Sequence, residues 1–374
     1  MKTLQLNQTI SEEALNSMLT SFKNRAAEND KDGIFVEENY AVLREYQLFS
    51  ALVPEELGGM GMPFMEMCHL LRKIAQACGS TALAFSMHQH LVAAAVWKYK
   101  HKSVGEPMLR KIVEDQLVLV STGARDWLGS NGEMKRTEGG YLVSANKHFA
   151  SQSIAGDVAI TSAPYLNEKG DWKVLHFSVP LKTKGVSIMN DWDVIGMRGT
   201  GSHGISFDSV FVPESAVSLE RNRDEFHPVW NVVLTVAMPL IMSVYVGIAE
   251  RAMELVISKA KNGLGNQEHL KYCVGKLNNR LVAAQTQWEA MYHVTNDFKF
   301  PMDQDNSTMI LSLKTNVEEA CKQTVSEAME SMGGQSFYKK NELERLFRDV
   351  QAASFHPLPK WNQYAFTGER ILSS

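Results

Sequence analysis

One histidine near the end of the chain stands where a helical pattern stops. The segment RDVQAASFHPLPKWNQ spans residues 348–363 and places His356 directly before Pro357, with Pro359 close behind. Neither proline can donate a backbone N–H, so the helix is predicted to end here and a loop to carry the imidazole. Histidine donates and accepts near pH 7, which makes His356 a candidate for acid–base work. The alternative is a helix C-cap that only hydrogen-bonds the last carbonyls.

The composition of the chain restricts the class of protein in which such a histidine could act. The chain has 374 residues, 44% hydrophobic and 21% charged, which is typical of a soluble globular protein of more than one layer or domain. A net charge of -4 gives no electrostatic reason to expect nucleic acid or an anionic membrane as a partner. The four cysteines are scattered without CxxC spacing, which indicates buried thiols in a reducing compartment.

Two segments bear on where the protein works. The first twenty residues, MKTLQLNQTISEEALNSMLT, contain no continuous apolar core, so we expect no secretory signal. The apolar stretch 229–249 is long enough to span a bilayer, but Asn231, Pro239 and several hydroxyl residues interrupt it. A helix buried on all sides of a bundle is the better interpretation. We therefore expect a cytoplasmic protein.

The hydrophobic period divides the chain into three parts. Residues 1–115 have helical spacing, residues 116–225 contain short strands of period two between glycine turns, and residues 226–374 return to long amphipathic helices. The strands predict a small antiparallel barrel or sandwich, and the last part predicts a helical bundle. No GxGxxG follows a strand, so the fold class is α+β and not a doubly wound nucleotide fold.

Four motifs in this order resemble those of the acyl-CoA dehydrogenase superfamily over nearly the whole chain. They are LVPEELGGMGMP, GSNGEMKRTEGGYLVSANKHFASQSIAGDVAITSA, WDVIGMRGTGSHGISFDSVFVPE and GGQSFYKKNELERLFRDV. The resemblance implies an N-terminal helical domain, a central antiparallel β-barrel and a C-terminal four-helix bundle. It also implies a flavoenzyme, usually a homotetramer with a dimer as the alternative, whose isoalloxazine lies between the β domain and the bundle.

The resemblance also assigns flavin-binding residues. A W-I-T tripeptide borders the flavin in the family, and its threonine hydroxyl meets flavin N5. The matching residues are Phe149, Ala150 and Ser151, and the serine keeps the hydroxyl. The alternative for Ser151 is an ordinary strand-end hydroxyl. Other cofactor-binding residues implied in the same way are Thr122, Gly129, Ser130, Gly333 and Gly334.

The chain departs from the family in its cofactor motif. FAD-binding members usually carry R-x-x-F-G after the first bundle helix, where the arginine reaches a pyrophosphate. The corresponding segment KAKNGLGNQEHLKY has lysines and no such arginine. This favours FMN and leaves FAD as the alternative, because a lysine can meet a phosphate as a point charge.

A second departure removes the catalytic carboxylate. The dehydrogenases abstract an α-proton with a glutamate, which must lie within hydrogen-bond reach of that proton. The two positions that supply this glutamate in the family fall on Pro357 and Asn231, counted from the neighbouring motifs. Neither side chain can act as a base.

One branch of the superfamily lacks the glutamate: the flavin-dependent monooxygenases of the dibenzothiophene-oxidising kind. They take reduced flavin from a partner reductase and use O₂ to oxygenate a small substrate. The resemblance to this branch implies that His356 and His88 hold the oxygen and that Ser151 lies at N5; His88 as a satisfied core histidine is the alternative, and His90 stands beside it. The substrate-binding residues would be Phe85, Met87, Asn231 and Trp361.

Two other functions stay open at this point. One is an acyl-CoA or acyl-carrier dehydrogenase with an unrecognised base, which predicts tight FAD and bleaching by a thioester. The other is a non-catalytic relative that has lost its chemistry, which predicts no flavin turnover.

Overall fold

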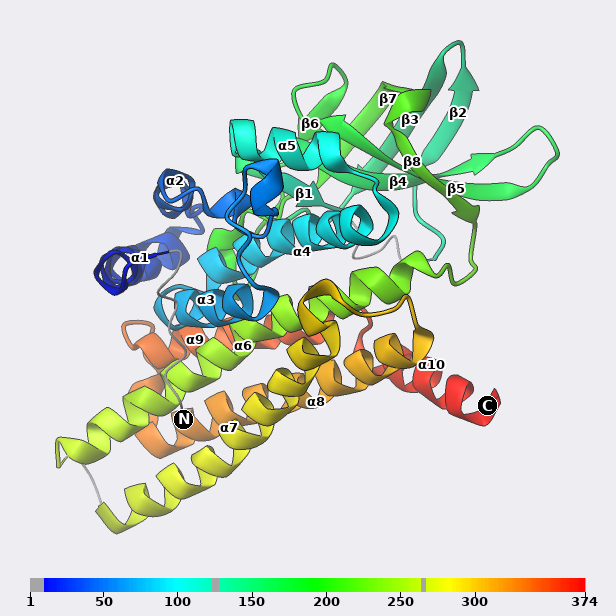
Figure 1. The fold of residues 1–374 in the computed structure, drawn as a ribbon. Helices are drawn as coiled ribbons and strands as arrows, with labels where there is room; N and C mark the ends of the chain where they lie inside the picture. The colour runs from blue at the N-terminus through cyan, green and yellow to red at the C-terminus, as the bar shows by residue number, and fades with distance from the viewer. Residues whose placement is uncertain (1–9, 123–127, 264–266, 374) are drawn as a thin grey trace.

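The computed structural model describes residues 10–122, 128–263 and 267–373. Within these ranges, helices come first, then one sheet, then long helices that pack beneath both (Figure 1). This confirms the predicted acyl-CoA dehydrogenase-like α+β fold. We keep the predicted division at residues 115/116 and 225/226 as a working description of the chain.

The N-terminal part is helical because its helices have clear starts, stops and apolar faces. α1 (Glu12–Asp32) begins at Ser11, whose hydroxyl accepts from the backbone N–H of Ala14, and ends at Gly33 in the left-handed region (φ 67°). The remaining helices are α2 (Glu37–Glu45), α3 (Phe64–Ala77), α4 (Gly79–Lys102) and α5 (Glu106–Asp115). α4 is buried on most of its surface and lies between the sheet and the bundle (Figure 1).

Among the described residues the central sheet has eight strands, and it is mixed where the sequence predicted an antiparallel arrangement. The strands are β1 (Leu119–Ser121), β2 (Glu133–Thr137), β3 (Gly140–Lys147), β4 (Val158–Leu166), β5 (Trp172–Pro180), β6 (Val186–Ile188), β7 (Ile205–Pro213) and β8 (Val217–Asn222). Hydrogen bonding follows the order β6-β7-β3-β2-β4-β5-β8. β1 pairs with β4 in parallel, as does β2 at one residue pair. Period two fixes the faces of strands but not their relative direction, so the sequence could not reveal these two pairings.

The C-terminal helices form the predicted bundle. Its members are α6 (Val229–Lys261), α7 (Gln267–Thr295), α8 (Gln304–Met332) and α9 (Glu342–Val350), followed by α10 (Lys360–Ser373). α6 is long and apolar enough to cross a membrane, but 94% of its most apolar window is buried by the rest of the protein. Burial inside the bundle therefore accounts for its composition, as the sequence predicted.

Candidate active site

His356 is held by a phenol from the bundle. It follows a short 3₁₀ turn, Gln351–Phe355, in extended conformation, and its Nε2 lies 2.5 Å from the Tyr245 hydroxyl on α6. Burial, followed by the nearby Lys314 and His90, lowers the pKa of His356 to about 3, so the ring is neutral. Burial raises the pKa of Tyr245 well above its ordinary value, so the phenol keeps its proton. The ring therefore meets a side chain of α6 and not the last carbonyls of α9, which argues against the C-cap alternative.

The direction of this hydrogen bond sets the tautomer of His356. A phenol O–H is a better donor than an imidazole N–H, and an imidazole nitrogen is a better acceptor than a phenol oxygen. Tyr245 thus donates to Nε2, and the ring proton lies on Nδ1. Within the described residues, Nδ1 has no hydrogen-bond partner. His356 therefore carries a donor that the fold leaves for something else.

The loop that carries His356 is anchored by a buried ion pair. Lys314 on α8 lies 2.9 Å from Glu318 and donates to the Leu358 carbonyl at 3.2 Å. Both charged side chains are almost completely buried. Lys314 therefore holds the loop by a hydrogen bond two residues beyond His356, and Tyr245 holds the imidazole ring by another.

His88 is satisfied by backbone groups on both sides. Its Nε2 lies 2.8 Å from the Phe49 carbonyl, and its Nδ1 accepts from the backbone N–H of Leu119 at 3.0 Å. Burial lowers its pKa to about 4, so it is neutral as this pattern requires. Neither nitrogen is left for an oxygen atom, and these contacts favour a structural joint between α4 and β1 over the predicted part in oxygen chemistry.

His90 is the second histidine of α4, and the sequence alone gives it no role. It lies two positions after His88, about 200° further around the helix, so the two rings point to opposite sides. Its Nδ1 is buried and has no hydrogen-bond partner in the described part of the chain. It also acts electrostatically on His356. The spacing of the two histidines was the signal in the sequence, because residues two positions apart point to opposite sides of a helix. Only one of these histidines can therefore face the bundle.

The other end of the site is a chain of hydroxyls that begins at Ser151. The Oγ atoms of Ser151 and Ser202 are 2.8 Å apart, and Ser202 lies 2.8 Å from the Thr200 hydroxyl. Thr200 in turn donates to the Met197 carbonyl at 2.9 Å. Phe149, two residues before Ser151, has a left-handed backbone (φ 58°) and leaves 49% of its surface exposed. A half-exposed ring next to a hydroxyl is a surface that a planar isoalloxazine would cover.

The remaining predicted cofactor residues divide into two groups. Thr122 donates to Thr161 at 2.7 Å on β4, and Ser130 bonds Ser162 at 3.0 Å on the same strand. Ala150 donates its N–H to the His203 carbonyl, and Gly129 lies against Asp224. Thr122 and Ser130 therefore lie against β4, and Ala150 directly precedes Ser151.

Gly333 and Gly334 lie apart from that group. They follow the C-terminus of α8, and Gly333 has the positive φ (74°) that ends the helix. The rise along α8 separates them from Lys314 by about 28 Å. The single chain thus does not bring them to His356. The segment on which the preference for FMN rested includes residues 264–266, which lie outside the described residues.

The predicted substrate residues are not all gathered at the site. Phe85 is buried with its ring edge-to-face against Phe49, and Met87 is partly buried against the same core. Asn231 accepts from the Ser307 hydroxyl at 2.8 Å between α6 and α8. Trp361 is 75% exposed on α10. Its position on the surface does not support contact with a substrate near His356 in the same chain.

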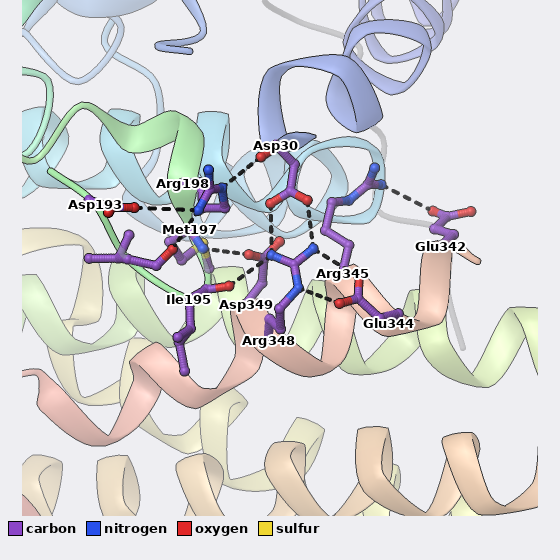
Figure 2. A network of polar contacts seen from close by, with 11 residues as sticks. Asp30, Asp193, Ile195, Met197, Arg198, Glu342, Glu344, Arg345, Arg348 and Asp349 are labelled. Carbon is purple, nitrogen blue, oxygen red and sulfur yellow. Dashed lines mark hydrogen bonds and ion pairs between the residues drawn. The ribbon is translucent and has the colours of Figure 1, made fainter. Parts of the chain in front are cut away.

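A polar network around Met197 and Asp349 lies between the hydroxyl chain and α9, and Figure 2 shows this network. The Met197 N–H donates to Asp349 at 2.5 Å, and Asp349 lies on α9, which leads to His356. Burial raises the pKa of Asp349 to about 6. Beside it, Arg348 makes a bidentate pair with Asp30 of α1 at 2.6 and 3.0 Å. Met197 therefore connects the hydroxyl chain from Ser151 to the helix that positions the histidine loop.

Comparison with known proteins identifies relatives of this arrangement. The families described as acyl-CoA dehydrogenase, N-terminal domain, and acyl-CoA dehydrogenase, C-terminal domain, match residues 7–116 and 240–361. An amino sugar nitrososynthase of Streptomyces peucetius is 24% identical and aligns over 92% of this chain and 88% of its own. The oxygenase component of p-hydroxyphenylacetate 3-hydroxylase from Acinetobacter baumannii is also 24% identical, over 86% and 78%.

A solved structure extends the similarity to three dimensions. The protein KijD3, in complex with FMN and dTDP-3-amino-2,3,6-trideoxy-4-keto-3-methyl-D-glucose, superposes with a TM-score of 0.88 at 25% identity. The alignment covers 96% of this chain and 92% of that one.

Proposed function

This chain belongs to the acyl-CoA dehydrogenase superfamily, and we propose that within it the chain is a flavin-dependent monooxygenase acting on a small organic substrate. The reaction would place one atom of O₂ in the substrate and release the other as water, with the two electrons taken from reduced flavin. The observation that carries the proposal is the Nδ1–H of His356, which has no hydrogen-bond partner among the described residues and which directly precedes Pro357, one of the two positions matched to the dehydrogenase glutamate. A neutral donor suits bound oxygen, and it cannot remove an α-proton from a thioester.

The residues present fit a flavin. Phe149 offers an exposed aromatic face, Ser151 offers a hydroxyl beside it, and Thr122 and Ser130 supply further hydroxyls at neighbouring strand ends. When bound, the flavin supplies electrons to O₂, and the protein holds it and excludes water. FMN is the favoured cofactor, supported by the FMN-bound relative, and FAD is the alternative.

Each end of the site has its own task in this proposal. Ser151 meets flavin N5, and His356 donates from Nδ1 to the oxygen that is to be transferred. Tyr245 and Lys314 are positioning residues that hold His356 through its ring and its loop. His90 is the second histidine on the bundle side, and His88 holds α4 to β1.

The partners follow from the same proposal. A monooxygenase of this kind needs reduced flavin from a separate reductase, in agreement with the oxygenase component among its relatives. We further propose a cytoplasmic homotetramer, in which Gly333 and Gly334 serve a flavin that lies away from their own His356.

The test begins without oxygen. Purified protein is loaded with photoreduced FMN, and separately with FAD, and is then mixed with O₂ in a stopped-flow spectrophotometer. We expect reoxidation of the bound flavin to be slow compared with free reduced flavin, with FMN preferred. Immediate reoxidation to free flavin and peroxide would contradict the proposal. Bleaching of bound FAD by an acyl-CoA thioester would establish the dehydrogenase alternative instead.

A further inference from the structure

The hydroxyls of Ser151, Ser202 and Thr200 form a chain of hydrogen bonds that ends at the Met197 carbonyl. That carbonyl determines which hydroxyl donates and which accepts at each step. The Met197 carbonyl is an acceptor only, and the Thr200 hydroxyl lies 2.9 Å from it. Thr200 must therefore donate its single hydroxyl proton to the Met197 carbonyl. At its other contact, 2.8 Å from Ser202, Thr200 can only accept.

The same argument, that each hydroxyl has one proton to donate, also fixes the role of Ser151. Because Thr200 accepts, Ser202 donates its one proton to Thr200. Ser202 must then accept a hydrogen bond from Ser151, whose hydroxyl oxygen lies 2.8 Å away, and Ser151 donates its only hydroxyl proton to Ser202. The Ser151 oxygen therefore presents only lone pairs to whatever binds beside Phe149.

Burial keeps this direction from being reversed by solvent. Thr200 is completely buried, Ser202 is 4% exposed and Ser151 is 8% exposed, so no water competes freely for these protons. The far end is fixed as well, because Met197 is tied through its own N–H to Asp349 at 2.5 Å. Turning the chain around would leave the Met197 carbonyl facing a hydroxyl lone pair at 2.9 Å.

We propose that Ser202 and Thr200 make Ser151 an obligate acceptor, so that the site selects reduced over oxidised flavin. Reduced flavin carries a proton on N5 and can donate to Ser151. Oxidised flavin has a bare N5 lone pair, which meets the Ser151 lone pairs without a hydrogen bond. Ser202 and Thr200 are thus positioning residues that act through Ser151. This inference rests on the proposed function only for the placement of N5 at Ser151.

The experiment compares the affinity of each protein for the two oxidation states of FMN. Dissociation constants are measured by fluorescence for oxidised FMN and, under anaerobic conditions, for photoreduced FMN. Ser202→Ala removes the acceptor of the Ser151 proton, and Thr200→Val frees the Ser202 proton to turn back toward Ser151. In both variants Ser151 can donate to oxidised N5. We expect the preference for reduced FMN to fall about tenfold in each, the size of one hydrogen bond.

Two matched variants serve as controls. Ser153→Ala removes a neighbouring buried hydroxyl that donates to the Gly201 carbonyl at 3.1 Å, outside the chain from Ser151. Thr200→Ser keeps a hydroxyl that can donate to Met197. Both are expected to keep the wild-type preference, and thermal unfolding checks that every variant is folded. Thr200→Val stands in for Ser202→Ala if the latter does not fold.

The outcomes separate the inference from the proposed function. A fall in preference in Ser202→Ala and Thr200→Val, absent from both controls, supports it. If wild type prefers reduced FMN and both variants keep that preference, the hydroxyl chain does not select the oxidation state, and the monooxygenase proposal stands without it. If wild type binds neither form, the proposed function fails, and this inference fails with it.

Discussion

Two histidines in this molecule both join separate elements, and they differ in burial and in the ring nitrogen that they leave open: His88 is completely buried, whereas His356 is only partly buried. His88 joins α4 to the 3₁₀ turn Leu48–Ser50 and to β1, and both its ring nitrogens bond backbone groups. His356 joins the C-terminal loop to α6 through one nitrogen, and its other nitrogen has no partner in the described chain. Both rings have a lowered pKa for the same first cause, burial.

The difference shows that a perturbed pKa does not by itself mark a catalytic residue. Both histidines are kept neutral, so titration alone would rank them together. The two histidines differ in whether a ring nitrogen is left without a hydrogen-bond partner. A ring whose nitrogens both bond backbone groups can only hold the fold together. Substitutions at the two histidines and at their partners should therefore have different effects.

Replacing His88 with alanine should cause the largest loss of stability. The change leaves the Phe49 carbonyl and the Leu119 N–H without partners and opens a cavity in the core. Together these should cost about 5 kcal/mol in free energy of unfolding. Urea unfolding measures the loss, with His356→Ala as the matched comparison at about 1 kcal/mol. Equal losses in the two variants would remove the distinction between the joints.

Removing the anchor of the His356 loop should cause the next largest loss of stability. Lys314→Met leaves the buried Glu318 with only the more distant Lys322, at 4.0 Å, and releases the Leu358 carbonyl, at a cost of about 4 kcal/mol. The double variant Lys314→Met, Glu318→Leu removes both charges and should recover most of that stability. It should not restore the loop, since Leu358 still lacks its donor. Hydrogen exchange of the backbone amides of Phe355, His356 and Leu358 would show whether the loop stays open, and the same protection in the double variant as in wild type would argue against the anchor.

Acid should weaken the His88 joint in a defined window. The folded pKa of His88 is about 4, below the unfolded value of about 6.5, so unfolding takes up a proton between these values. The contribution of His88 is complete above pH 6.5 and is lost as the pH falls toward 4, by about 2 kcal/mol at pH 5. Asp349, whose pKa is raised to about 6, changes in the opposite direction over the same window.

The measurement for this window is urea unfolding at pH 7.5 and pH 5.0. Wild type is compared with His88→Gln, which cannot take up a proton. The variant should show a smaller loss of stability on acidification. An equal loss in both proteins would mean that His88 does not titrate with unfolding.

The sequence predicted the fold better than it predicted which histidine does what. Hydrophobic period, glycine turns and four ordered motifs sufficed for the three parts of the chain, because these signals are local. The partners of His88 are backbone atoms of Phe49 and Leu119, 39 and 31 residues away, which no local pattern specifies. Tyr245 lies 111 residues before His356, within the predominantly apolar first part of α6, so nothing in the sequence singled it out. Trp361 follows the histidine loop closely in sequence, yet its helix turns it toward solvent.

The smallest expected change in free energy is the one that bears most directly on function. If Nδ1–H of His356 holds the reacting oxygen, losing it should speed the escape of peroxide from the protein loaded with reduced FMN about tenfold, the value of one hydrogen bond. His356→Ala should show this loss, and so should His356→Gln, whose amide reaches the position of Nε2. His356→Asn places an amide N–H where Nδ1 was, and it should keep most of the wild-type behaviour. Tyr245→Phe frees the ring to change tautomer and should fall between these, whereas Tyr292→Phe, a buried phenol elsewhere in the bundle, should have no effect. If the asparagine and glutamine variants released peroxide at the same rate, the nitrogen that the fold leaves open would not be the one that does the chemistry, and the contrast with His88 would be one of packing alone.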